Sequence, residues 1–92
     1  MKGKRDRLGI INDILEIVRD KAQVKPTQVM YKANLSHEML TSYLNELLTK
    51  GFLVEHSDKA GRKTYALTEK GFHFLRDYKI IKGFVESYGL QE

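Results

Sequence analysis

The chain has no cysteine and only one proline among its 92 residues. The absence of cysteine excludes disulfide bonds, thiolate zinc sites and cysteine nucleophiles, and it fits a reducing cytoplasm. No apolar run approaches the roughly 18 residues that a membrane-spanning helix needs, and the charged N-terminal stretch lacks the continuous apolar core of a secretion signal. We therefore expect a soluble cytoplasmic protein with no membrane partner.

Residues with catalytic chemistry are also scarce. The three histidines, His37, His56 and His73, are scattered, and no carboxylate or histidine lies at metal-ligand spacing from them. The neighbours His56, Ser57 and Asp58 share one loop, which is not how a catalytic triad is built. The chain also lacks a glycine-rich phosphate loop and a dinucleotide-binding fingerprint. We expect neither an enzyme nor a metal or other cofactor.

Positive charge is in modest excess. Sixteen Lys and Arg residues against twelve Asp and Glu residues give a formal net charge of +4, and the isoelectric point is near 9.4. Hydrophobic residues make up 41% of the chain and charged residues 30%, which is the composition of a folded chain and, at this length, of one domain. A basic domain of this size favours a polyanion over an acidic protein as its partner.

The first predicted helix covers residues 6–21. Its apolar side chains recur at three- and four-residue steps in one row, which contains Leu8, Ile11, Leu15, Val18 and Ala22. Ile10, Ile14 and Ile17 form a second row beside it, so that apolar side chains cover nearly half of the helix surface. We interpret this wide face as contacting two surfaces, the chain's own core and a partner, with Ile10 and Ile17 left unburied in a single chain.

Residues 26–32 and 37–50 are predicted to form two helices joined by a tight turn. Pro26 suits the first position of the first helix. Ser36 is an N-cap for the second helix, which Gly51 ends. The core-facing side chains of the second helix are Leu40, Tyr43, Leu44, Leu47 and Leu48. Two helices joined by so short a turn are typical of a helix-turn-helix.

The hydrophobic period changes after these helices. Residues 52–56 and 63–67 are short β-prone runs, and the polar connection between them contains Gly61, as a hairpin turn requires. A last helix starts after the N-cap Thr68. The order helix, helix, helix, hairpin, helix predicts a mainly α fold with a small β-hairpin, a winged helix-turn-helix over residues 1–71.

A heptad pattern runs along the last helix, with four- and three-residue steps between its apolar side chains. Phe72 and Leu75 lie on another side, toward the hairpin and the core. Gly83 weakens this helix, and Gly89 ends it. We predict that residues 72–92 form a coiled-coil-like dimerisation helix; the alternative is that the heptad seam is buried against the first helix of the same chain. The predicted dimer interface comprises Ile10, Ile17, Phe74, Tyr78, Ile81, Phe84, Val85 and Tyr88.

Several runs of the sequence carry a resemblance to one protein family. They are Lys-Pro-Thr at 25–27, Tyr-Lys-Ala-Asn-Leu-Ser at 31–36, Tyr-Leu at 43–44, Lys-Gly-Phe-Leu at 50–53, and Arg-Lys-Thr-Tyr-Ala-Leu-Thr-Glu-Lys-Gly at 62–71. On these runs the chain, from residue 8 to about residue 78, resembles the small archaeal winged-helix DNA-binding proteins, which include the ten-kilodalton chromatin-associated dimers.

The resemblance implies double-stranded DNA binding by a homodimer whose C-terminal helices pair antiparallel. It implies a role in chromatin organisation or in transcription regulation, without separating the two. The last helix departs from the family pattern, because it is short and contains Gly83 and Gly89, whereas the chromatin dimers tend to carry a longer rod. This departure leaves the dimer geometry and the half-site spacing open.

The outward face of the second helix of the helix-turn-helix is the candidate base-reading surface, because such a helix lies in the major groove. Asn45 has the amide that bonds adenine, and Thr41 and Ser42 have hydroxyls that bond several base edges. No arginine lies on this face, which predicts a mild sequence preference or a preference for A·T pairs. The alternative is an ordinary solvated helix. The outward residues are Glu38, Ser42, Asn45 and Thr49, flanked by His37 and Thr41.

Lysine and arginine cluster at the N-terminus, around the two helices of the helix-turn-helix, and at the hairpin tip. Each is a candidate to neutralise a phosphate, and Arg62 is a candidate for a narrow minor groove; alternatively, the hairpin charges only protect an exposed β-edge. Tyr31 either bonds a phosphate through its hydroxyl or packs against the following helix. The candidate cations are Lys2, Lys4, Arg5 and Arg7, then Lys25, Lys32 and Lys50, and finally Lys59, Arg62 and Lys63.

Together these features predict a homodimer that binds double-stranded DNA in the nucleoid, as a transcription regulator or as a chromatin-associated architectural protein. Two alternatives remain open. One is a winged-helix protein–protein interaction module without DNA binding. The other is a ligand-gated repressor with an effector pocket between the first and last helices, whose effector is unknown.

Overall fold

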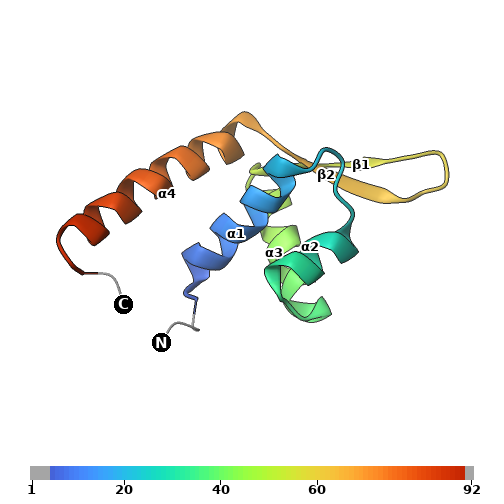
Figure 1. The fold of residues 1–92 in the computed structure, drawn as a ribbon. Coiled ribbons are helices and arrows are strands. Elements are labelled where there is room, and N and C mark those ends of the chain that lie inside the picture. The colour runs from blue at the N-terminus through green and yellow to red at the C-terminus, as the bar shows by residue number, and fades with distance from the viewer. Residues whose placement is uncertain (1–4, 91–92) are drawn as a thin grey trace.

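The computed structural model describes residues 5–90. Three helices, a hairpin and a long helix follow one another in the predicted order (Figure 1). Their bounds are α1 Arg7–Asp20, α2 Pro26–Ala33, α3 His37–Thr49, β1 Leu53–Ser57, β2 Lys63–Leu67 and α4 Glu69–Ser87. The prediction of a mainly helical winged fold with a small hairpin and a C-terminal helix is confirmed.

Side-chain caps set where the helices begin. Ser36 Oγ accepts a hydrogen bond from the backbone N–H of Met39 at 3.1 Å, and Thr68 Oγ1 accepts one from that of Gly71 at 3.1 Å. Both caps are those predicted from the sequence, and each satisfies a backbone donor that has no partner inside its helix. The turn between α2 and α3 uses Asn34 in the left-handed conformation, with a φ of 57°, which ends α2 without a glycine.

The core lies between α1, α2, α3 and the base of the hairpin. Tyr65 on β2 belongs to it, with 5% of its surface exposed, and its backbone N–H donates to the carbonyl oxygen of Val24 at 3.1 Å. This bond ties the hairpin to the α1–α2 connection and so places the hairpin beside α3. The most deeply buried large side chains are Ile14, Leu15, Val24, Val29 and Leu47.

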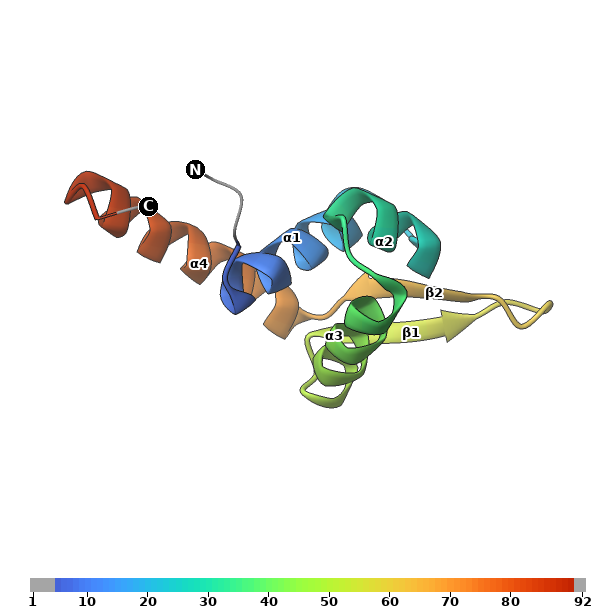
Figure 2. The same ribbon diagram turned by 90° about the horizontal axis from the view of Figure 1, so that it is seen from below.

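The hairpin projects from this core as a wing. β1 and β2 pair antiparallel, with Leu53 opposite Leu67 at the base and Ser57 opposite Lys63 near the tip. Within β1 only Leu53 is buried, so most of the wing is exposed to solvent. Figures 1 and 2 show the wing and the C-terminal end of α4 at opposite ends of the molecule, which measures 50 × 27 × 21 Å.

α4 begins in the core and then leaves it (Figure 1). A Cβ atom on Gly71 would lie 2.5 Å from the carbonyl oxygen of Phe52, so the first turn of α4 needs the close approach that glycine allows. Leu75 is buried, with 7% exposed, but the exposed fractions rise to 59% for Ile81 and 61% for Phe84. The second half of α4 therefore carries an apolar surface that its own chain leaves uncovered.

Several expectations about individual apolar side chains are wrong. Ile10 is only 8% exposed, because α1 packs against α2, β2 and α4 and its wide apolar face fills the space between them. Ile17 is half-buried against the same core. Leu8, expected in the core, is 50% exposed, and Phe72 on α4 is exposed to the same extent. The exposed apolar side chain on α1 is therefore Leu8 rather than Ile10.

Candidate nucleic-acid interface

One face of α3 is open to solvent. Leu40, Leu44 and Leu47 are buried, whereas the polar residues expected to face DNA are exposed. The Thr41 hydroxyl donates to the carbonyl oxygen of His37 at 2.9 Å, so its remaining hydrogen-bonding capacity toward a partner is as an acceptor. The exposed polar residues of α3 are His37, Glu38, Thr41, Ser42, Asn45 and Thr49.

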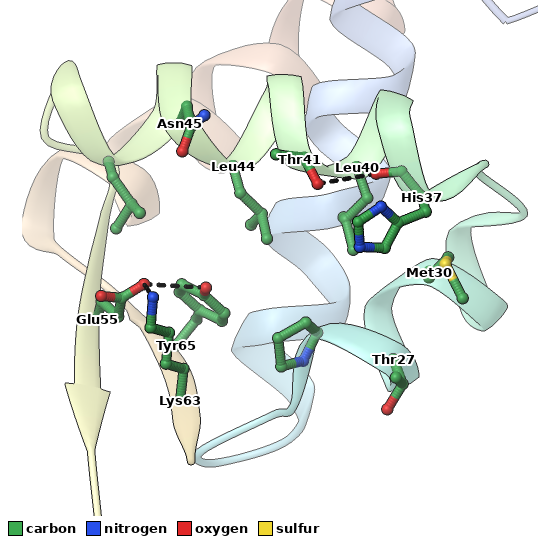
Figure 3. A pocket seen from close by; sticks show the side chains of 12 residues that line it. Thr27, Met30, His37, Leu40, Thr41, Leu44, Asn45, Glu55, Lys63 and Tyr65 are labelled. Atoms are coloured by element: carbon green, nitrogen blue, oxygen red, sulfur yellow. Dashed lines mark hydrogen bonds and ion pairs between the residues drawn. The ribbon is translucent and has the colours of Figure 1, made fainter. Parts of the chain in front are cut away.

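A groove of about 300 Å³ separates α3 from the wing (Figure 3). From α3, Thr41 and Asn45 contribute to its lining, and from the wing Glu55, Lys63 and Tyr65 do so. The remaining lining is mostly apolar and comes from α2 and α3. The predicted base-reading helix and the predicted phosphate-binding wing therefore border the same groove.

Glu55 is the centre of a polar cluster on the wing side of this groove (Figure 3). The Tyr65 hydroxyl donates to Glu55 Oε2 at 3.0 Å, and Lys63 Nζ lies 4.0 Å from the same oxygen. Burial, together with the hydrogen bond to Glu55, raises the pKa of Tyr65 to about 12, so the phenol remains a donor at neutral pH. The sequence prediction missed Glu55, because only the hairpin register places it opposite Tyr65.

The tip of the wing holds an arginine in a defined position. Asp58 Oδ1 accepts hydrogen bonds from the backbone N–H groups of Ala60 and Arg62, each at 2.9 Å, and Asp58 Oδ2 pairs with Arg62 Nε at 2.8 Å. The backbone bond from Arg62 is the main cause of the lowered pKa of Asp58. The Arg62 side chain is 68% exposed, so its outer N–H groups face solvent. Lys59 and Lys63 are exposed as well.

In the N-terminal basic cluster, unlike at the wing tip, the arginine side chain contacts other elements of the same chain. Arg5 donates to Asp13 Oδ2 and to the carbonyl oxygen of Ala33, both at 2.6 Å. Arg5, expected to contact phosphate, therefore already has two internal partners, a carboxylate of α1 and the C-terminal carbonyl of α2, which compete with such a contact. Lys4, the other arm residue expected to bind DNA, lies outside the described residues, as does Lys2.

A second ion-pair network joins α1 to α3. Arg7 pairs with Glu46 and lies over the ring of Tyr43, 6.0 Å from its centre, while Lys50 pairs with Glu46 at 3.0 Å. Hydrogen bonds from Arg7 and then from Lys50 lower the pKa of Glu46 to about 2. Arg7 and Lys50, expected as phosphate contacts, already have an internal partner. The four-residue spacing of Glu46 and Lys50 is a signal that the sequence contains, whereas the contact with Arg7 is not.

Tyr31 and Lys32 lie in the last turn of α2, directly before the turn to α3. Tyr31 is 81% exposed, so the alternative that it packs against α3 is wrong; no other element covers this side of the short helix within the described chain. Lys32 is exposed too. The two side chains extend the open surface of the helix-turn-helix and remain candidates for phosphate contact.

The apolar seam of α4 is divided between the chain's own core and solvent. Phe74 stacks on Tyr78, with ring centres 5.7 Å apart, and meets Phe52 edge-on at 5.9 Å. Tyr78 is half-buried, and this burial raises its pKa. The start of the seam is thus partly covered within one chain, by Phe52, which lies between α3 and β1 rather than on the first helix. Farther along, Ile81, Phe84 and Tyr88 are exposed, and Val85 is half-buried.

A second groove, of about 540 Å³, lies between the N-terminal half of α1 and the C-terminal half of α4. Leu8, Asp13 and Gly9 line it from α1, and Ile81 and Lys82 line it from α4. This is the position at which the sequence analysis placed an effector pocket in the ligand-gated alternative. The groove is continuous with the exposed apolar surface of α4, since Ile81 belongs to both.

The histidines of the chain are far apart in the fold. His37, His56 and His73 lie on three separate elements, α3, β1 and α4. No group of three His, Asp or Glu side chains in this part of the chain is placed to hold a metal ion. Nor is any helix there both long and apolar enough to cross a membrane.

The three helices, the wing and the exposed polar face of α3 define a winged-helix fold. The family model described as winged helix-turn-helix matches residues 4–85. The chain therefore belongs to the winged helix-turn-helix family.

Three individual proteins are similar to this chain. The uncharacterized protein MJ0287 of Methanocaldococcus jannaschii is 34% identical over 68 residues, which are 74% of this chain and 64% of that relative, so this chain spans less than two thirds of it. The crystal structure of Sso10a-2, a DNA-binding protein from Sulfolobus solfataricus, superposes with a TM-score of 0.79 and 26% identity over 91% of this chain and 85% of that one. FabT from Streptococcus pneumoniae, in complex with DNA, superposes with a TM-score of 0.68 and 25% identity over 89% of this chain and 61% of that one. The resemblance to small archaeal winged-helix DNA-binding proteins is confirmed.

Proposed function

We propose that this chain is a homodimer that binds double-stranded DNA and acts as a transcription regulator or as a chromatin-associated architectural protein. The observation that carries the proposal is that the exposed polar face of α3 and the basic wing border one groove, with Asn45 on the helix and Lys63 on the wing. The similarity to Sso10a-2 and FabT supports it, because the first is a DNA-binding protein and the second was solved with DNA.

In this proposal α3 lies in the major groove. Asn45 bonds adenine, while Ser42, Thr41 and His37 contact neighbouring base edges. The exposed face has no arginine to read guanine, so the sequence preference is mild. The phosphates are bound by the wing and the end of α2, and by the N-terminal arm only through Lys4. The proposed phosphate-binding residues are Lys59, Arg62, Lys63, Tyr31, Lys32 and Lys4.

The second half of α4 supplies the dimer contact. Ile81, Phe84 and Tyr88 expose 59%, 61% and 74% of their surfaces, and full burial of one Ile or Phe side chain contributes about 1.5–3 kcal/mol. Pairing of two α4 helices covers this surface and the groove beside Leu8. Residues 72–92 then act as the dimerisation helix, and residues 1–71 act as the DNA-binding unit. Phe74, Tyr78 and Val85 contribute through their exposed edges, whereas Ile10 and Ile17 serve the core.

A mobility shift on a mixed-sequence duplex over a range of salt concentrations tests DNA binding. We expect the affinity to fall as a steep power of the salt concentration, because each lysine or arginine that neutralises a phosphate releases counterions. Asn45→Ala is expected to change the preference among sites more than the overall affinity. Absence of any shift in dilute buffer would refute the proposal and favour the protein-interaction module.

Genome-wide occupancy separates the two roles within the proposal. A regulator gives narrow peaks, whereas an architectural protein covers the chromosome broadly. Either pattern corresponds to a nucleoid-associated protein in the cytoplasm. If small metabolites raise the melting temperature instead, the groove between α1 and α4 holds an effector.

A further inference from the structure

The wing carries negative as well as positive charge, and Glu55 and Lys63 border the α3 groove. Its cations are Lys59, Arg62 and Lys63, and its carboxylates are Glu55 and Asp58. Each carboxylate faces one cation: Asp58 pairs with Arg62 at 2.8 Å, and Glu55 lies 4.0 Å from Lys63. Two of the three cations that the wing offers to a polyanion therefore have a competing anion of the same chain beside them.

The two carboxylates have different structural roles. Asp58 accepts two backbone hydrogen bonds in the turn, so its position at the tip is explained by the hairpin itself. Glu55 accepts no backbone hydrogen bond among those found in residues 5–90; its partners are the Tyr65 hydroxyl and the Lys63 ammonium. The turn does not need Glu55, and its charge calls for another explanation.

Glu55 is also held in place. Tyr65 is part of the core, with 5% of its surface exposed, so its hydroxyl is a fixed donor that keeps the Glu55 carboxylate at 3.0 Å. The Glu55 side chain still has 34% of its surface exposed. This hydrogen bond favours the position of the carboxylate in the groove, beside Lys63.

We propose that Glu55 is an internal counter-ion that competes with DNA phosphate for Lys63 and thereby limits the affinity of the wing for DNA. The inference rests on the proposed DNA-binding function. Phosphate binding at Lys63 has to displace the loose 4.0 Å contact with Glu55 and bring two negative groups together, and both effects oppose binding. The wing thus holds DNA less tightly than its three cations alone would.

The test is a double-mutant cycle in the full-length chain with Glu55→Gln, Lys63→Gln and the double variant. Glutamine keeps an oxygen acceptor for the Tyr65 hydroxyl and removes only the charge. Affinity for one duplex is measured by fluorescence anisotropy over a range of salt concentrations, and thermal melting checks that each variant is folded. The matched control is Glu86→Gln, which removes the same charge from an exposed position on α4, at the end of the molecule opposite the wing (Figure 1).

We expect Glu55→Gln to bind about two- to fivefold more tightly than the unmodified chain, as for the loss of an exposed ionic contact, and with a steeper salt dependence. We expect the gain to vanish in the Lys63→Gln background, since Glu55 acts through Lys63. Glu86→Gln is expected to leave the affinity unchanged.

Three results would overturn the inference while leaving DNA binding intact. Equal affinities of Glu55→Gln and Glu86→Gln would mean that Glu55 has no local effect. Weaker binding by Glu55→Gln would mean that the carboxylate contacts the DNA itself, for example a cytosine amino group. Persistence of the gain without Lys63 would mean direct repulsion of the phosphate. If the unmodified chain fails to bind any duplex in dilute buffer, the proposed function fails, and the inference fails with it.

Discussion

α1 and α4 are alike in sequence but differ in what their apolar side chains do. Both helices carry two adjacent rows of apolar residues, and both were expected to supply a dimer interface. In α1 the second row is covered, with Ile10 at 8% exposed, whereas in α4 Phe84 is 61% exposed. The difference follows from position, because α1 is surrounded by α2, β2 and α4, while α4 passes beyond the end of the core. The width of an apolar face indicates how much surface needs covering; the neighbouring elements determine what covers it.

The largest effect on stability is expected from shortening a side chain in the buried apolar row of α1. Ile10→Ala should lower the free energy of unfolding by about 2–5 kcal/mol, because it removes buried methyl groups and leaves a cavity. Leu8→Ala, two residues before Ile10 and half exposed in the single chain, should cost below about 1 kcal/mol. Urea unfolding at one protein concentration measures both. Similar losses in the two variants would contradict the assignment of Ile10 to the core.

The role of the exposed apolar row of α4 is tested by introducing a charged side chain into it. Ile81→Glu should convert the proposed dimer into a monomer in sedimentation velocity while leaving the helical circular dichroism unchanged. The reason is that the side chain is 59% exposed in the single chain but faces the second copy in that dimer. Lys79→Glu, an exposed change on the polar side of α4, is the control and should remain dimeric. A persistent Ile81→Glu dimer would place the interface elsewhere.

The basic clusters at the wing tip and at the N-terminus also differ in what their side chains contact, although both are rich in lysine and arginine. Arg62→Ala should weaken binding to all duplexes and reduce the salt slope by about one unit, since this guanidinium is exposed at the wing tip. Arg5→Ala should leave the salt slope nearly unchanged and lower the melting temperature instead, because Arg5 is bonded to Asp13 and Ala33. Anisotropy titrations and melting curves separate the two outcomes. An equal loss of slope for both arginines would restore the N-terminal arm as a DNA contact.

The smallest effect is a pH dependence at the α1–α3 contact. The pKa of Glu46 is lowered from 4.5 to about 2 in the folded chain, so its pairing with Arg7 and Lys50 stabilises the fold fully above the unfolded pKa. That contribution should be lost as the pH falls through the folded value. Glu46→Gln should therefore show a smaller drop in melting temperature between pH 5 and pH 2 than the unmodified chain. If the melting temperatures of the two proteins fall equally with pH, the ion pair does not contribute to stability, as many exposed pairs do not.

Much of the fold could be predicted because it depends on local chemistry. Ser36 and Thr68 cap helices through hydrogen bonds to residues three positions on, and Gly61 closes the hairpin turn with a φ of 79°. Such signals lie within a few residues of one another, so a single sequence contains them. The exposed polar face of α3 was predictable for the same reason, since the leucine spacing determines which side is buried.

The features that the sequence did not reveal depend on contacts between distant residues. The sequence left open whether Tyr31 packs against α3, and the side chain is 81% exposed. Arg7 was expected to face DNA and pairs with Glu46, which lies 39 positions away. Glu55 was not considered at all, although it faces Tyr65 across the hairpin. Residue type and spacing do not reveal these partners, because they depend on how whole elements pack.

The amino-acid sequence by itself determined the order of elements, their ends and the polar character of the exposed face of α3, since caps, turns and helical periodicity act over only a few residues. The tertiary structure alone decided which apolar row is covered, which arginines face solvent, and which carboxylate stands beside Lys63. The physical reason is that burial and ion pairing are properties of two surfaces in contact, and a linear sequence describes each surface separately.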